Sequence, residues 1–479
     1  MYNRGQIIDL DISEYAYGGK GIAKIPTQKG VFNIFVANSF PGQKVKAQIT
    51  KKRKNYLEAK LISIIDRSEI EIDSEFQEIS GGPYIRVPIE VQKEIKKETT
   101  LKEFSKLSGY SAISECFDEW IPSPSSFFYR NKMEYSFSCI EHCIDSQQEI
   151  DDSFALGFKR RGTWWKVENL NNPSGLFDYE WEKELHAVRE YLKSTNLPAW
   201  HPPKKHGFFR HLVVRKSFDT NSFLLNLVTS SEGVDKFNTS DFVEFLLSKF
   251  GAKIAGIQHT INDNHADRSK IENGECSLLY GDLIITQKIS GLEFEISMES
   301  FFQTNPQCAE KLYKKALDYV CDEVIEKDKI VLDLFCGTGT IGQLLSNRSE
   351  NIKVIGIDIV EEAIEDARRN ARRNKLDSLS FVASDVGKFL KIKPELQGKI
   401  ASIILDPPRA GIAPKTLKKV IALNAKNIVY ISCNPSTQAR DASSLIEAGY
   451  GIEKISLVDQ FPHTGHIESI VKFKKSNES

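Results

Sequence analysis

The chain has 479 residues, enough for two or three domains, and its hydrophobic content of 41% is sufficient for packed cores. Its formal net charge is −1, so the charge of the whole chain does not indicate nucleic-acid binding. No segment resembles a signal peptide or a membrane span, and we expect a cytoplasmic monomer. The eight cysteines are scattered without a Cys-x-x-Cys pair, so a disulfide framework or a metal site is not expected.

The first 62 residues differ from the rest of the chain in charge. They hold 11 Lys and Arg against 4 Asp and Glu, so they carry +7 while the remaining residues carry −8. Short apolar stretches separated by glycine-containing turns predict a small antiparallel β-barrel over residues 1–62. The basic run 51–54, with further lysines in the same segment, favours a phosphate-contacting surface over an ordinary solvated turn.

Residues 63–299 predict a mixed, strand-rich domain. A charged helix is expected from about residue 90 to residue 108, and alternating apolar stretches predict strands at 209–215 and 222–228. The pattern does not repeat regularly, so only an α+β class is predicted for this part of the chain.

Two segments of that domain, 127–132 and 158–166, interleave aromatic rings with Arg and Lys. Aromatic faces can stack on unpaired bases while the cations meet phosphates. The same pattern also arises when the rings face a core and the cations face solvent. The sequence favours neither interpretation.

From about residue 300 the pattern becomes regular. Short apolar strands alternate with helix-like segments, of which residues 361–374 form the clearest helix. Such alternation predicts a doubly wound α/β domain over residues 300–479, which binds ligands at the carboxyl ends of its strands. The predicted strands are 330–334, 354–357, 379–382, 403–405 and 428–431.

A glycine-rich turn follows the first of these strands. Residues 337–342 fit G-x-G-x-x-G, and Asp358 ends the next strand, where a carboxylate can accept hydrogen bonds from both hydroxyls of a ribose. These residues alone do not separate NAD from S-adenosylmethionine. Asp333 before the glycines and Asp406 in an Asp-Pro-Pro-Arg motif favour the methyl donor.

Cys433 lies in a polar Ser-Cys-Asn-Pro turn directly after the fifth strand. Methylation of a pyrimidine at C5 needs a thiolate that adds to C6 and a base that later removes the C5 proton. A lone cysteine is ordinarily a buried filler, but a filler does not suit a polar turn at the cofactor edge. We expect a nearby helix N-terminus or cation to lower the pKa of this thiol.

Glu468 is the candidate base, although a glutamate at the start of a strand can simply face solvent. Cys336 lies inside the glycine turn, and we expect it to pack beneath the cofactor. A thiol beside the methyl donor would compete with the intended acceptor, so Cys336 is not the predicted nucleophile.

These motifs together resemble the bacterial RNA 5-methyluridine methyltransferase family, whose members modify transfer RNA or 23S ribosomal RNA. The resemblance covers essentially the whole chain and implies that residues 1–62 form an RNA-binding TRAM barrel. It implies that Cys433 is the nucleophile and Glu468 the base. It also implies S-adenosylmethionine contacts by Gln303, Phe335, Gly337, Gly339, Thr340, Asp358, Asp385 and Asp406.

The chain departs from this family at two places. Many relatives have Asn where this chain has Thr340. Many also bind a 4Fe–4S cluster through cysteines that here correspond to Ser74, Ser80, Pro83 and a position near Asn172. Serine and proline do not replace thiolates as iron ligands, so we expect no cluster.

The sequence therefore predicts an α/β Rossmann-like class I methyltransferase domain, preceded by an OB-like TRAM barrel and a mixed α+β domain. The predicted function is methyl transfer from S-adenosylmethionine to C5 of a uridine in RNA, with 23S ribosomal RNA slightly favoured over transfer RNA. The rivals are an RNA cytosine-C5 methyltransferase, which shares the thiol chemistry, and a non-catalytic RNA-binding or ribosome-assembly protein. An amino-group methyltransferase is disfavoured because Arg409 stands where that class places an aromatic residue.

Overall fold

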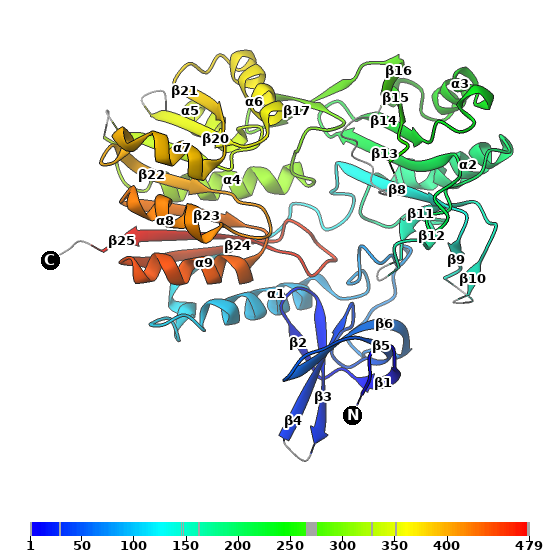
Figure 1. Ribbon diagram of the computed structural model, residues 1–479, viewed down its shortest axis with the longest axis horizontal. Coiled ribbons are helices and arrows are strands. Elements are labelled where there is room, and N and C mark those ends of the chain that lie inside the picture. The colour runs from blue at the N-terminus through cyan, green and yellow to red at the C-terminus, as the bar shows by residue number, and fades with distance from the viewer. Residues whose placement is uncertain are drawn as a thin grey trace.

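The computed structural model describes residues 2–27, 30–144, 146, 148–160, 163–264, 275–326, 329–349 and 352–476. Figure 1 shows a small β domain at the N-terminal end, a second domain built on a sheet, and an α/β domain that holds the C-terminal part of the chain. The predicted fold class is confirmed. None of the described helices has the length and apolar character that crossing a membrane requires.

The N-terminal domain is a six-stranded sheet, in the order β1-β5-β6-β4-β3-β2, with its own apolar core. Strand β5 shows why it forms: Val45, Ala47 and Ile49 are buried while the lysines between and beside them are exposed, as the two-residue period of a strand requires. The strands are β1 (Ile7–Asp11), β2 (Glu14–Ala16), β3 (Lys20–Thr27), β4 (Gly30–Ala37), β5 (Lys44–Lys52) and β6 (Tyr56–Asp66).

The second domain is a nine-stranded sheet, in the order β10-β9-β12-β11-β8-β13-β14-β15-β16. Helices α2 (Tyr179–Ser194) and α3 (Thr239–Phe250) bury apolar residues in the same core as its strands. The two predicted strands are present. The strands are β8 (Lys132–Ser138), β9 (Glu141–His142), β10 (Glu149–Ile150), β11 (Ala155–Lys159), β12 (Val167–Asn169), β13 (Phe209–Ser217), β14 (Ser222–Thr229), β15 (Ile254–Ile261) and β16 (Glu275–Gly281).

The α/β domain contains an eight-stranded sheet, in the order β21-β20-β19-β22-β23-β25-β24-β7. The five predicted strands are present and run parallel. The hairpin β17 (Ile284–Ile289) and β18 (Leu292–Ser297) packs against α4 and α6. The strands of this sheet are β7 (Phe117–Ile121), β19 (Ile330–Leu334), β20 (Lys353–Asp358), β21 (Leu379–Ala383), β22 (Ile400–Leu405), β23 (Asn427–Ser432), β24 (Tyr450–Val458) and β25 (Glu468–Lys475). The helices are α4 (Pro306–Cys321), α5 (Thr340–Arg348), α6 (Glu361–Arg373), α7 (Val386–Ile392), α8 (Pro414–Ala422) and α9 (Pro435–Glu447).

Besides the β17–β18 hairpin, two more elements from the segment predicted as the middle domain join the α/β domain. Strand β7 pairs in parallel with β24 at the edge of that sheet. Helix α1 (Ile89–Phe104), shorter than predicted, packs against α9, and Figure 1 shows it beneath the α/β domain. The span 63–299 therefore contributes to two bodies. Which sheet an edge strand joins is decided by tertiary packing, which has no local sequence signal.

Helix α1 also holds the loop that precedes β25. The Lys96 ammonium lies 2.7 Å from a carboxylate oxygen of Asp459 and 3.0 Å from the carbonyl oxygen of Phe461. Both charged side chains are buried. One turn earlier, the Gln92 amide oxygen accepts a hydrogen bond of 2.8 Å from the backbone N–H of His463. These contacts fix the path of the loop into β25.

Replacing Lys96 with Met should lower the free energy of unfolding by about 3–5 kcal/mol, because the Asp459 carboxylate stays buried without its counter-ion. Urea unfolding followed by tryptophan fluorescence measures the change. Lys24→Met is the control, since the Lys24–Glu14 ion pair is exposed and its loss should cost no more than about 1 kcal/mol. Equal losses in the two variants would contradict the role assigned to the buried pair.

Candidate active site

Cys433 and Glu468 lie opposite each other at one end of the α/β sheet. Ser432, the last residue of β23, pairs with Ser469 of the antiparallel strand β25. The residue after Ser432 and the residue before Ser469 are therefore cross-strand neighbours. Glu468 is buried, and Cys433 is half-buried in the turn before α9. The hydrogen bonds of the sheet thus bring together a thiol and a carboxyl that are distant in the sequence.

The surroundings raise the pKa of both groups. Burial and then the Glu468 carboxyl raise the pKa of the Cys433 thiol to about 11, although the Arg409 guanidinium opposes them. Burial and then the Asp406 carboxyl raise the pKa of Glu468 well above its ordinary value. The expected nearby cation is Arg409, which lowers the pKa of the thiol, but loss of hydration and the Glu468 carboxyl outweigh it, so the net shift is upward and not downward.

Arg409 links the motif after β22 to the turn after β23. Its Nη2 atom is 3.1 Å from Nδ1 of His466, which lies two residues before Glu468. Its carbonyl oxygen accepts hydrogen bonds from Nδ2 of Asn434 at 2.9 Å and from Oγ1 of Thr437 at 3.2 Å. The backbone of Arg409 is therefore held by the turn, and its guanidinium contributes positive charge at this end of the sheet.

The turn between β19 and α5 needs glycine at two positions. Gly337 and Gly339 have φ values of 52° and 70°, a region that side chains rarely adopt. A side chain at Gly339 would also begin 2.4 Å from the ring of Phe381. Phe335 shares this left-handed conformation, at φ 65°, and its N–H donates to the carbonyl oxygen of Ile357 at 2.8 Å. The turn is compact enough for a ligand to approach its backbone.

Two further residues of this turn are turned toward the protein. Thr340 is buried as the first residue of α5, with Oγ1 3.4 Å from Oγ1 of Thr338. The Cys336 thiol packs beside Phe381, and burial raises its pKa well above the ordinary value. A protonated, packed thiol fits the expected bystander role of Cys336.

Asp358 is the last residue of β20, and Asp385 follows the neighbouring strand β21. The two oxygens of Asp358 each accept a hydrogen bond of 2.9 Å, from the N–H groups of Gly337 and Val360. Each oxygen keeps another lone pair, so the carboxylate is oriented and still able to accept from a ribose. Asp385 caps α7, accepting from the N–H of Lys388 at 2.8 Å.

Two carboxyls, the buried Asp333 and the half-buried Asp406, lie where β19 meets the end of β22. Burial is the main cause that raises the pKa of Asp333 and of Asp406 to about 7. Oδ1 of Asp333 is buried without a hydrogen-bond partner among the described residues. A cationic ligand would relieve these carboxyls. These two carboxyls therefore fit S-adenosylmethionine, which carries a positively charged ammonium and a positively charged sulfonium.

Gln303 lies in the approach to α4, near the loop that leads to β25. Its carbonyl oxygen accepts from Nδ2 of Asn131 at 3.1 Å, and its Oε1 is 3.5 Å from Nε2 of Gln460. The predicted cofactor residues thus come from the approach to α4 and from the carboxyl ends of β19 to β22.

The two aromatic and basic segments of the middle of the chain are mostly turned inward. The Phe127 ring stacks on His463 at a centroid distance of 4.4 Å, and the Tyr129 hydroxyl donates to the carbonyl oxygen of Pro462 at 2.9 Å. Phe158 packs against a buried core, whereas Trp164 is 53% exposed. Arg161 and Gly162 lie outside the described residues. Packing therefore explains most of these rings, and Trp164, which lies edge-on to Trp165 at 5.7 Å, is the most exposed ring in the described part of 158–166.

Sequence reasoning missed two aromatic residues of the site. Tyr17, in the N-terminal domain, packs against the apolar cluster that includes Ile467 and Tyr430. Phe301 is 69% exposed, and its ring lies 4.0 Å from where a side chain on Gly337 would begin. The sequence showed an aromatic residue two positions before Gln303 but gave no sign that it was exposed. Nothing local connected Tyr17 with the thiol.

The positions that correspond to cluster ligands in relatives have ordinary contacts here. The Ser74 hydroxyl accepts from the N–H of Phe76 at 3.2 Å, and the Ser80 hydroxyl donates to the carbonyl oxygen of Lys159 at 3.0 Å. Among the described residues, no group of three or more His, Cys, Asp or Glu is arranged to hold a metal. The lack of a cluster stays a prediction.

Comparisons with known proteins agree with this geometry. The tRNA (Uracil-5-)-methyltransferase family matches residues 279–476, and the TRAM domain matches residues 3–62. RNA methyltransferases from Clostridium tetani and Clostridium acetobutylicum are 35% and 37% identical to this chain, over 99% of each chain compared. The crystal structure of Pyrococcus abyssi tRNA (uracil-54, C5)-methyltransferase in complex with S-adenosyl-L-homocysteine has a TM-score of 0.68 at 25% identity. It covers 97% of this chain and 100% of its own.

The chain therefore belongs to the RNA uracil-C5 methyltransferase family and begins with a TRAM domain. The resemblance inferred from its motifs is confirmed.

The pKa values predict how activity depends on pH. In the predicted chemistry the thiol and the carboxyl act in their deprotonated forms, so kcat/KM should rise with pH through the neutral and alkaline range. Arg409→Gln removes the cation that lowers the pKa of Cys433, and the rising limb should move to higher pH. Arg372→Gln, in an exposed part of α6, is the control. An unshifted profile for Arg409→Gln would contradict the electrostatic role of this residue.

Proposed function

We propose that this S-adenosylmethionine-dependent methyltransferase modifies C5 of a uridine in RNA, with Cys433 as nucleophile and Glu468 as base. The observation that carries the proposal is the β23–β25 register, which sets the thiol opposite the carboxyl. The carboxyls at the ends of β19 and β22 lie at the same edge of the sheet. A pyrimidine between the thiol and the carboxyl would present C6 to one and C5 to the other.

Cys433 and Glu468 then act in successive steps of the reaction. The Cys433 thiolate adds to C6, and the electron pair of the C5–C6 double bond makes C5 nucleophilic. S-adenosylmethionine supplies the electrophilic methyl group when it is bound. Glu468 takes the proton from C5, the double bond re-forms, and the C6–S bond breaks with its electron pair returning to Cys433.

The raised pKa values fit an enzyme that is activated by its ligands. A cationic donor near Asp406 favours the ionised form of the carboxyls around it. Asp406 is also the second cause, after burial, of the raised pKa of Glu468. Asp358 would hold the ribose and Asp385 would lie toward the adenine. Gln303, Phe335, Gly337, Gly339 and Thr340 would line the remainder of the cofactor site.

RNA contact is proposed for the N-terminal barrel and its groove. The groove is lined by Lys20, Phe35, Thr50 and Lys60, and β3, β4 and β6 set Lys20 and Lys60 on either side of Ala37. Cations beside an aromatic ring suit a nucleic-acid strand. Together with the +7 charge of residues 1–62, this supports an RNA partner.

Two RNA substrates are candidates within this proposal. Resemblance of the sequence slightly favours 23S ribosomal RNA, whereas the Pyrococcus abyssi enzyme is named for uracil 54 of tRNA. Mapping 5-methyluridine in total RNA from a deletion strain identifies the target by the site that is lost. A lost 5-methylcytidine instead would favour the cytosine-C5 rival.

Cys433→Ala should abolish methyl transfer and leave S-adenosylmethionine affinity nearly unchanged, because the thiol acts on the base and not on the donor. Incorporation of labelled methyl groups into RNA measures the transfer, and calorimetry measures the affinity. Cys276→Ala, at an exposed and free cysteine, should behave like the wild type. Substantial turnover by Cys433→Ala would exclude the covalent mechanism.

The Glu468→Gln variant should methylate C5 but leave the C5 proton in place, so the C6–S bond cannot break efficiently. A protein–RNA adduct that survives denaturation should accumulate on a gel. The double variant Cys433→Ala/Glu468→Gln is the control and should form none. Release of product by Glu468→Gln at the wild-type rate would assign the base to another group.

We also propose that the protein folds and works without an iron–sulfur cluster. Hydrogen bonds such as that from Ser80 to Lys159 take the place of ligation. Anaerobically purified protein should contain neither iron nor sulfide in stoichiometric amounts, and chelators should leave its melting temperature unchanged. A brown preparation with near-stoichiometric iron would contradict this.

A further inference from the structure

Tyr17 is a side chain beside the thiol and the carboxyl that the proposed mechanism leaves unused. It follows β2 in a tight turn, where Gly18 and Gly19 have φ values of 81° and 76°. This turn of the barrel enters the α/β domain. The N-terminal domain therefore reaches the active site with its own backbone, besides offering an RNA-binding surface.

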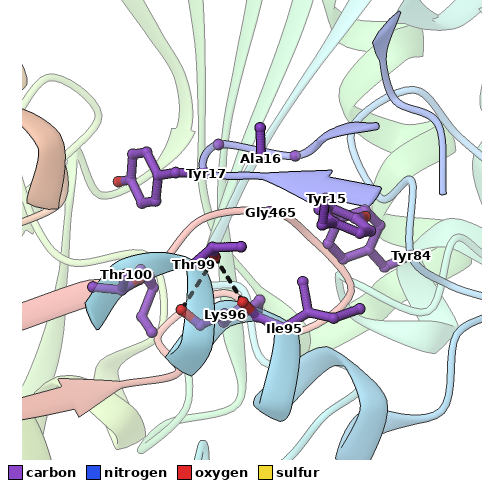
Figure 2. A pocket seen from close by; sticks show the side chains of 12 residues that line it. Tyr15, Ala16, Tyr17, Tyr84, Ile95, Lys96, Thr99, Thr100 and Gly465 are labelled. Carbon is purple, nitrogen blue, oxygen red and sulfur yellow. Dashed lines mark hydrogen bonds between the residues drawn. The ribbon is translucent and has the colours of Figure 1, made fainter. Parts of the chain in front are cut away.

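The approach of the two backbones leaves no room for side chains. A side chain on Gly465 would begin 2.7 Å from the Cα atom of Gly19. Gly465 lies in the loop before Glu468, and a small pocket between barrel, loop and α1 is lined by Tyr17, Gly19, Gly465 and Ile467. Figure 2 shows Tyr17 and Tyr15 directed toward opposite ends of this pocket, with α1 crossing below them.

The two tyrosines have different surroundings. The Tyr15 ring packs edge-on against Phe40 at 5.2 Å and against Tyr84 at 5.7 Å, and this cluster anchors the turn. The Tyr17 ring instead packs on the apolar cluster of the α/β domain. Its hydroxyl forms no hydrogen bond with any residue in the described ranges.

Tyr17 shares its pocket with Ile467, the residue before Glu468, and two ionisable groups of the site act on it electrostatically. Burial raises its pKa far above the ordinary value, and the Cys433 thiol and the Glu468 carboxyl are the next two causes. A phenol with a raised pKa stays protonated at neutral pH. It can therefore donate a hydrogen bond, but it does not act as a phenolate anion. Tyr17 is thus a neutral donor beside both reacting groups.

We propose that Tyr17 is a substrate-contacting residue whose hydroxyl donates a hydrogen bond to a carbonyl oxygen of the target base. The inference rests on the proposed function, which puts the base between Cys433 and Glu468. When the thiolate adds to C6, negative charge develops on the base, and a donor already in place stabilises it. The groove that includes Lys20, three residues further along the barrel, would lead the RNA strand to this point.

Tyr17→Phe tests the proposal, because it keeps the ring packing and removes only the hydroxyl. We expect the single-turnover rate of methyl transfer at saturating RNA and S-adenosylmethionine to fall by about tenfold, with little change in RNA affinity or melting temperature. Adduct formation with RNA that contains 5-fluorouridine, which stops before loss of the C5 substituent, should slow by a similar factor. Tyr15→Phe, two residues away in the anchoring cluster, is the matched control and should keep the wild-type rate.

The outcomes separate the two proposals. An unchanged rate and unchanged adduct formation in Tyr17→Phe, with an active wild type, would overturn the role of Tyr17 and leave the proposed function standing. A wild-type protein that transfers no methyl group to any RNA would overturn the proposed function, and the role of Tyr17 with it. An equal loss in Tyr15→Phe and Tyr17→Phe would show that the turn acts only by docking the barrel, and would also overturn the contact.

Discussion

The candidate active site depends on the antiparallel pairing of β25 with β23. The parallel strands beside β23 end at one edge of the sheet, and β25 begins there, so its first residue meets the residue that follows β23. Because side chains alternate between the faces of a strand, a slip of one residue would turn Glu468 to the other face. The backbone ladder therefore sets the relation between thiol and carboxyl. Helix α1, through Lys96 and Gln92, then holds the loop that enters β25.

The same end of the sheet concentrates acidic groups in a dry environment. Asp333, Asp406 and Glu468 are all held with raised pKa values, and burial is the first cause in each case. Such a site favours a cationic ligand, and the ligand in turn favours ionised carboxyls. Binding of the methyl donor and ionisation of Glu468, the proposed base, would thereby be coupled. The Arg409 guanidinium likewise favours the ionised form of Cys433, although burial raises the pKa of this thiol by more than Arg409 lowers it.

Segments from the first quarter of the chain complete a site whose chemistry lies in the last. The barrel turn at Tyr17 and Gly19, helix α1, and the loop around Gly465 meet at one pocket. Domain boundaries drawn from composition do not reveal these contacts. The barrel contacts the loop around Gly465, and β7 extends the sheet of the α/β domain. The RNA contact proposed for the barrel and the reaction proposed at the sheet would consequently take place in one structural unit.

The sequence by itself determined the features that rest on local patterns. The alternation of strands and helices predicted the α/β sheet, the short apolar stretches between glycine-containing turns predicted the barrel, and the turn at Gly337 and Gly339 with Asp358 indicated the cofactor site. The polar turn around Cys433 singled out the thiol. Only the tertiary structure decided that Glu468 faces that thiol, that β7 and α1 join the catalytic body, and that Tyr17 lies beside both groups. These relations depend on strand register and on packing between distant segments, and burial, which reversed the expected pKa shift of Cys433, depends on the same packing.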